Sequence, residues 1–219
     1  MTKPNNQAQA QALNPTQAHW ESVYTHKPAD AVSWYAPHLD ESLRYIARAA
    51  PEKAQAILDA GGGESTLVDD LLRAGHVDIT VLDISAKALA DTRHRLGPAG
   101  DRVKWLAADV LEADLPTAAF DVWHDRAVFH FLTTDDQRTR YVRQVLKALK
   151  PGGHAIVGTF GPDGPLQCSG LDVARYAPDE LHGAFGDPFE LLDTRIDLHT
   201  TPWGSTQQFV YCFCRRSLS

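Results

Sequence analysis

Short apolar runs alternate with amphipathic stretches along most of this 219-residue chain. Gly, Pro or acidic residues bound each run, which is typical of buried strands. The runs predict strands at 56–59, 79–83, 103–107, 120–124 and 154–160. Apolar residues at helical spacing predict helices at 40–49, 65–74, 85–97 and 135–149. Such an alternation favours a parallel sheet covered by helices.

The pattern changes after residue 160. Residues 161–176 are punctuated by Gly and Pro and are too long for a simple connector, so we expect a functional loop. A short helix at 178–185 and two strands at 189–199 and 206–215 follow. The turn between these strands is too short for a crossover helix, so they must pair antiparallel. The predicted fold is α/β: a three-layer sandwich with a mostly parallel seven-stranded sheet and an antiparallel last strand.

Charge and cysteine content exclude several classes of protein. The chain carries 21 basic and 28 acidic residues, a net charge of −7, and no basic stripe, so a nucleic-acid partner is not expected. No apolar run is long enough to span a membrane, and no signal peptide is visible at the start. Three cysteines without framework spacing indicate a reducing compartment. We therefore expect a cytoplasmic monomer or homodimer without a membrane partner.

A glycine-rich turn follows the first predicted strand. Asp59 ends the strand, and Gly61, Gly62 and Gly63 come next, ahead of a predicted helix. Glycine permits a tight turn and removes the Cβ that would block a ligand from the backbone. The turn therefore predicts a nucleotide-like ligand at the carboxyl end of this strand.

Two further acidic residues end the neighbouring strands. Asp83 ends the second strand, where a carboxylate can accept both hydroxyls of a ribose. Asp109 follows the third strand, where it can accept from the exocyclic amine of adenine. Ile84 and Val110 could then sandwich the base.

The glycine spacing separates two classes of cofactor. A dinucleotide fold favours G-x-G-x-x-G, and here that register gives Gly61, Gly63 and Thr66. Asp59 would repel a pyrophosphate but would attract a sulfonium that carries an α-amino group. A nicotinamide oxidoreductase is therefore disfavoured.

With these motifs in this order, the chain resembles the class I S-adenosylmethionine-dependent methyltransferases over roughly residues 40 to 215. The resemblance rests on the segments 59–65, 120–126 and 150–153, together with Asp83 and Asp109. Ser65 stands where the family usually has its third glycine. The resemblance implies a Rossmann-like fold, S-adenosylmethionine as cofactor, and an N-terminal segment that closes the pocket. We expect Trp20 and Tyr24 against the cofactor and Trp34 and Tyr35 against the methyl acceptor.

The acceptor side of the site is expected beyond the fourth and fifth strands. His124 has three open interpretations: a general base, a cofactor contact or a structural hydrogen-bonding group. We expect Asp125 to orient Arg126 or the cofactor amine. Arg126 is a candidate for binding an anionic acceptor or the methionine carboxylate.

Other polar residues near the strand ends carry weaker expectations. His130 would contact the substrate or form a partly buried wall beside its aromatic neighbours. Cys168 would be part of a thiophilic acceptor site or a small buried loop residue, and we favour the second interpretation. His199 is read as an exposed residue at a strand end, and Cys212 and Cys214 as core packing. No pair of cysteines has zinc-ligand spacing, so no metal is expected.

The leading hypothesis is a methyltransferase for a small-molecule acceptor, with a lean to a thiol or another soft nucleophile that needs little help from a base. A protein lysine or N-terminal methyltransferase and a non-catalytic cofactor-binding regulator are the alternatives. We expect a flexible tail at 1–18 and one methyltransferase domain at 19–219. Within it, 19–50 would form a lid and helix, 51–160 the cofactor-binding core, and 161–219 the acceptor loop and closing strands.

Overall fold

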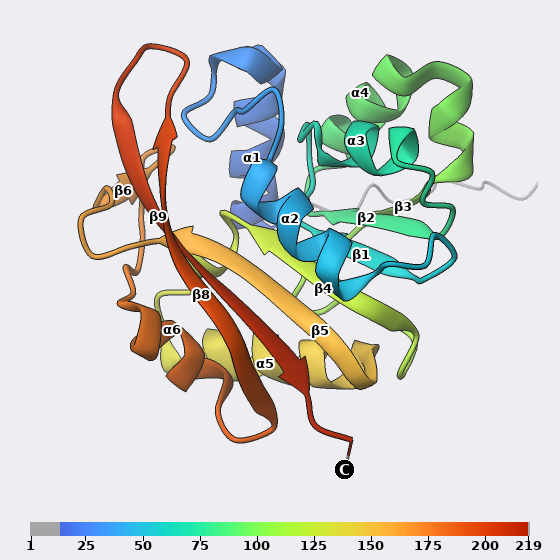
Figure 1. Ribbon diagram of the computed structural model, residues 1–219. Helices are drawn as coiled ribbons and strands as arrows, with labels where there is room; N and C mark the ends of the chain where they lie inside the picture. Colours follow the sequence, from blue (N-terminus) through green and yellow to red (C-terminus); the bar gives the residue numbers. More distant parts are fainter. Residues whose placement is uncertain (1–13, 219) are drawn as a thin grey trace, which may run out of the picture.

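The computed structural model describes residues 14–218 and contains a seven-stranded sheet in the order β3-β2-β1-β4-β5-β9-β8 (Figure 1). The strands are β1 (Ile57–Ala60), β2 (Ile79–Asp83), β3 (Lys104–Ala107), β4 (Phe120–Arg126), β5 (Leu149–Phe160), β8 (Phe189–Thr200) and β9 (Thr206–Arg216). Only β9 runs antiparallel to the other strands of this sheet. The predicted fold class is confirmed.

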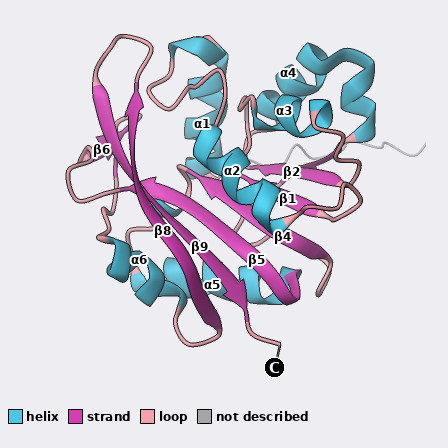
Figure 2. Cartoon of the chain, viewed as in Figure 1, coloured by secondary structure: helices cyan, strands magenta, loops and turns pink. Residues whose placement is uncertain are grey.

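Helices cover both faces of the sheet, as Figure 2 shows. They are α1 (Pro15–His26), α2 (Asp40–Ala49), α3 (Leu67–Arg73), α4 (Ala86–Leu96), α5 (Asp135–Ala148) and α6 (Pro178–Phe185). Apolar side chains of α2, α3 and α4 share one core cluster with the sheet. Side chains of α5 and α6 share a second cluster on the opposite face. The two clusters make the three layers of the sandwich.

Local signals position several helix ends where the sequence predicts them. The Ser85 side chain accepts a hydrogen bond from the amide of Ala88 at the start of α4, and Gly97 follows the last residue of that helix with φ of 55°. Thr134 and Gln137 form a reciprocal capping box at the start of α5. These caps fix where each helix begins beside the strand ends.

The N-terminal helix α1 was not expected. Asn14 caps it, and only Val23 and Tyr24 are buried, so its sequence shows little helical periodicity of apolar residues. The expected tail boundary at residue 18 is therefore wrong, because 15–18 are helical. The rest of the predicted tail, residues 1–13, lies outside the described residues.

Two other segments differ from expectation. Strand β5 begins at Leu149, and the residues 150–153 that are predicted as a turn lie inside it as an irregularity, between the pairs Phe120–Leu149 and Val122–His154. The predicted loop at 161–176 contains a small hairpin of β6 (Gln167–Cys168) and β7 (Leu171–Asp172). Within residues 14–218, no helix combines the length and apolar character that crossing a bilayer needs.

Candidate active site

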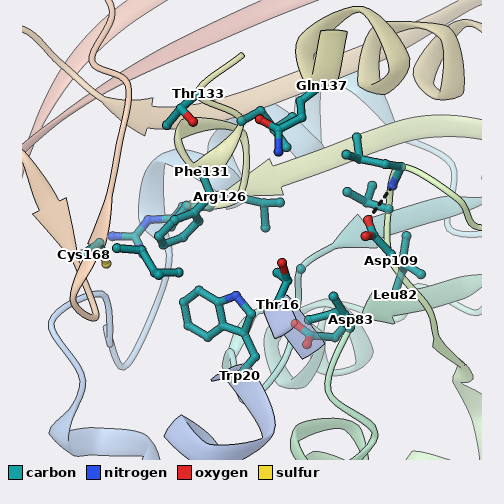
Figure 3. Close-up of a pocket in the computed structure, with 18 of the residues that line it drawn as sticks. Thr16, Trp20, Leu82, Asp83, Asp109, Arg126, Phe131, Thr133, Gln137 and Cys168 are labelled. Atoms are coloured by element: carbon teal, nitrogen blue, oxygen red, sulfur yellow. Dashed lines mark hydrogen bonds between the residues drawn. The ribbon is translucent and has the colours of Figure 1, made fainter. Parts of the chain in front are cut away.

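A cavity of about 390 Å³ lies beyond the carboxyl ends of the central strands. Ten residues expected in the site line it: Trp20, Tyr24, Trp34, Gly61, Asp83, Ile84, Asp109, Val110, Arg126 and Cys168. Figure 3 shows Asp83 and Asp109 on one side of the cavity and Arg126 and Cys168 on the other. A smaller hollow of about 30 Å³ adjoins it and is lined by Tyr35, Asp59, Gly62, His124 and Arg126, among others.

The glycine turn leaves no space for side chains. A Cβ on Gly62 would lie 2.5 Å from Asp59 Oδ2, and a Cβ on Gly63 would lie 2.7 Å from the Tyr24 hydroxyl. Gly61 and Gly63 also have positive φ, at 72° and 39°. The turn therefore exposes its backbone to the cavity, as the sequence predicts.

The two acidic residues at the ends of β2 and β3 are held by backbone amides. The amide of Ser85 donates to Asp83 Oδ1 at 2.8 Å, and the amide of Leu111 donates to Asp109 Oδ1 at 2.9 Å. Burial, with a smaller contribution from the Asp59 carboxylate, raises the pKa of Asp83 to about 7. Asp83 is thus a carboxylate in an apolar wall that hydroxyl donors would stabilise.

Asp59 lies on the neighbouring strand β1 and is 3% exposed. His124 Nδ1 donates to its Oδ1 at 2.7 Å, while its Oδ2 has no partner among residues 14–218. The second ring nitrogen of His124 is 2.8 Å from the Ser42 hydroxyl. Because both nitrogens are engaged and the ring is buried, the geometry supports the structural hydrogen-bonding interpretation of His124 rather than the general base.

The N-terminal segment covers this end of the sheet. The Trp20 ring packs edge-on against Phe131 and Trp34, with centroids 5.1 and 5.9 Å away. Glu21 accepts hydrogen bonds from the Ser85 hydroxyl at 3.0 Å and the Ala86 amide at 2.8 Å. Helix α1 is therefore fastened to the first turn of α4, directly above Asp83.

Arg126 at the end of β4 faces both hollows. Its Nη1 donates to the carbonyl of Trp34 at 2.8 Å, and its guanidinium lies 4.4 Å from the centre of the Phe209 ring. Within residues 14–218 it takes part in no ion pair with a carboxylate. A partly buried cation without a carboxylate partner suits an anionic ligand.

Asp125 corrects one expectation. Successive side chains of a strand point to opposite faces, so Asp125 points away from His124 and Arg126. The Tyr141 hydroxyl donates to its Oδ2 at 2.5 Å and the Val128 amide to its Oδ1 at 3.0 Å. Among the described residues Asp125 makes no hydrogen bond or ion pair with Arg126, and it lines neither hollow. Its role is to hold β4 against α5.

The remaining histidines also differ from expectation. His130 is fully buried and lines neither hollow; its ring stacks on Phe160 with centroids 4.3 Å apart, and burial lowers its pKa to about 3. His130 therefore forms part of a buried wall, which is the second of the two expected roles. The first expected role, contact with the substrate, does not fit its position. His199 is buried rather than exposed, and its Nε2 donates to the carbonyl of Ser33 at 2.8 Å.

The cysteines behave as core residues. Cys168 is buried beside the cavity, and burial raises the pKa of its thiol to about 11, so it is protonated at neutral pH. Cys212 and Cys214 lie in the core of the sheet, as predicted.

Sequence reasoning missed several residues that build the site. They are Thr16, Glu21, Ser42, Val128, Thr133 and Gln137. Ser42 is the clearest case, because it lies on the buried face of α2 together with Tyr45, Ile46 and Ala49. A small polar residue on a buried helical face is the signal that could have found it.

Comparison with known proteins identifies this arrangement. A family model described as a methyltransferase domain matches residues 57–153. The mouse eEF1A lysine and N-terminal methyltransferase is 25% identical over 138 residues, which cover 63% of this chain and 19% of that protein. The 27-O-demethylrifamycin SV methyltransferase of Amycolatopsis mediterranei is 32% identical over 107 residues, covering 48% of this chain and 38% of the relative. The chain thus spans only a fraction of the length of these relatives.

A solved structure has the same architecture over nearly the whole chain. It comes from work on the conversion of a disulfide bond into a thioacetal group during echinomycin biosynthesis, with a TM-score of 0.75, 18% identity and coverage of 93% of this chain and 94% of that one. The match over residues 57–153 shows a methyltransferase domain of the class I, S-adenosylmethionine-dependent type, whose cofactor is S-adenosylmethionine.

Proposed function

We propose that this protein binds S-adenosylmethionine in the cavity and transfers its methyl group to a small-molecule acceptor. The observation that carries the proposal is that Asp83 and Asp109 line the cavity, Asp59 lines the adjoining hollow, and Gly61 of the glycine turn lines both. The residues fit the cofactor, because Gly61, with a φ of 72° and no Cβ, brings the backbone of the turn to the wall of both hollows. The unpartnered Oδ2 of Asp59 suits a cationic amine.

Each residue has a role in holding this ligand. Asp83 would accept from the ribose hydroxyls and Asp109 from the adenine amine, with Ile84 and Val110 against the base. Asp59 would accept from the methionine amine, and Arg126 would bind the methionine carboxylate or an anionic acceptor. When bound, the cofactor supplies an electrophilic methyl group on a positively charged sulfur. The lid residues Trp20, Tyr24, Trp34 and Tyr35 would exclude water from it.

A small acceptor with a soft nucleophile suits the acceptor side. The lid and the β6–β7 hairpin close over the cavity, whose wall is largely apolar there: Trp20, Trp34, Phe131, Leu132 and Leu171. Among the described lining residues, no histidine faces the main cavity to take up a proton. A thiol ionises in part near neutral pH and needs no such base. The rifamycin relative, named for a small-molecule substrate, supports the same class of acceptor.

A protein lysine or terminal amine is the second candidate acceptor. The match to the mouse eEF1A lysine and N-terminal methyltransferase favours it. The enclosure of the cavity by α1 opposes it, since a polypeptide acceptor needs an open groove.

An acceptor screen with methyl-labelled S-adenosylmethionine tests the proposal. We expect label on small thiols in preference to amines, carboxylates or protein acceptors, and loss of labelling in Asp83→Ala. Label on protein lysines alone would contradict the small-molecule acceptor. Absence of turnover with every class would favour a regulator that binds the cofactor without catalysis.

A further inference from the structure

A buried chain of hydrogen bonds leads from the core to Asp59. It links Asp59 Oδ1 to His124 Nδ1 at 2.7 Å, His124 Nε2 to Ser42 Oγ at 2.8 Å, and Ser42 Oγ to the Tyr211 hydroxyl at 3.1 Å. All four residues are at most 3% exposed. They come from β1, β4, α2 and β9, so four elements of the fold converge on one carboxylate.

Strand register makes this contact specific. Asp59 and His124 are directly paired residues of the parallel strands β1 and β4, so their side chains project from the same face of the sheet. The alternative face of β4, which carries Asp125, packs against α5. His124 is therefore the residue of β4 that lies directly beside Asp59.

The donor and the acceptor of each hydrogen bond in this series follow from the carboxylate of Asp59 at its end. A carboxylate only accepts, so His124 must donate from Nδ1. In a neutral ring Nε2 then accepts from the Ser42 hydroxyl, whose oxygen accepts from Tyr211. Each donor in this series of hydrogen bonds has one acceptor, and Asp59 Oδ2 has no partner among residues 14–218.

We propose that His124, held in its Nδ1–H tautomer by Ser42 and Tyr211, is a positioning residue that fixes the Asp59 carboxylate for the amine of the cofactor's methionine. The inference rests on the proposed function. It assigns His124 to the recognition of the amino-acid end of the cofactor and removes it from proton transfer. Without the His124 donor, the Asp59 carboxylate can rotate. Its Oδ2 would then no longer point toward the proposed position of the amine beside Gly62.

Ring nitrogen NMR of the ligand-free protein tests the tautomer directly. We expect His124 to be neutral, with its proton on Nδ1, and we expect Ser42→Ala to shift the Nε2 signal. A proton on Nε2 alone, or a doubly protonated ring at pH 8, would overturn the assignment. This measurement requires neither turnover nor a bound ligand.

Calorimetry with two ligands tests the positioning role. S-adenosylhomocysteine carries the amine, and 5′-methylthioadenosine lacks the whole amino-acid end. We expect His124→Leu to weaken binding of the first about tenfold or more. Binding of the second should change by less than about twofold, because it makes no contact that depends on Asp59. His124→Asn, whose amide can still donate to Asp59, should restore most of the affinity.

The outcomes separate the two proposals. Equal losses for both ligands in His124→Leu, or an unchanged affinity for S-adenosylhomocysteine, would overturn the positioning role alone. Binding of neither ligand by the unaltered protein would overturn the proposed function and, with it, this inference. Thermal unfolding accompanies each titration, and if His124→Leu does not fold, Ser42→Ala provides the same comparison with a smaller expected loss.

Discussion

The charged form of Asp83 has opposite effects on the stability of the fold and on the proposed binding of the ribose. Burial raises its pKa to about 7, whereas a carboxyl in an unfolded chain titrates near 4. Between these values the folded protein binds a proton that the unfolded chain does not. The contribution of Asp83 to the stability of the ligand-free protein therefore falls as pH rises from about 4 to about 7 and is constant above that range. The same carboxylate is the proposed acceptor for the ribose, so binding favours the form that folding disfavours.

Replacing Asp83 by Asn should increase stability and weaken ligand binding. Asn avoids the buried charge, so we expect the free energy of unfolding of the ligand-free protein at pH 8 to rise by about 1–3 kcal/mol. The gain should vanish near pH 4, and S-adenosylhomocysteine should bind more weakly. Urea denaturation at pH 4, 6 and 8 measures the first effect. A difference that does not depend on pH would show that burial of the charge is not its cause.

At the scale of elements, the position of α1 depends on one acidic side chain. Glu21 accepts from the first residues of α4, where the helix dipole favours negative charge. Because α1 lines the cavity beside Asp83, we infer that release of a bound ligand requires this contact to break. The hydrogen bonds of Glu21 therefore hold α1 against the start of α4.

Glu21→Ala should speed dissociation of S-adenosylhomocysteine by about threefold to tenfold, since the lost contacts are comparable to a helix N-cap. Stopped-flow fluorescence of the lid tryptophan Trp20 measures the rate. Asp30→Ala is the matched control, because Asp30 is an exposed acid in the same segment. A similar acceleration in the control would assign the effect to net charge instead.

The opposite face of β4 carries a structural network of its own. Tyr141 donates to Asp125 and accepts from Trp123 Nε1 at 2.9 Å, and all three residues are fully buried. Tyr141→Phe leaves Trp123 Nε1 and Asp125 Oδ2 without these hydrogen bonds and should lower the free energy of unfolding by about 1–3 kcal/mol. Ligand affinity should persist at a temperature where the variant is folded, as calorimetry would measure. Lost affinity with unchanged stability would contradict the assignment of Asp125 to the scaffold.

At the scale of the whole molecule, the sequence predicts what local patterns encode. The strand ends that carry Asp59, Asp83 and Asp109 follow from apolar runs bounded by acidic residues and glycine. Helix α1 has only two buried residues, so no helical periodicity of apolar residues predicts it. Ser42 and Glu21 act through partners far away in the chain, and only the assembled fold brings those partners near. Asp125 was misjudged because strand alternation was not applied to three consecutive polar residues.

The cofactor that the cavity accepts decides the reaction of this protein. Titration calorimetry of the unaltered protein with S-adenosylhomocysteine and, separately, with NAD tests this most directly. We predict one S-adenosylhomocysteine per chain, bound at least about tenfold more weakly by Asp83→Ala because a charge-assisted hydrogen bond is lost, and no heat from NAD. Binding of NAD in preference to S-adenosylhomocysteine would contradict the account.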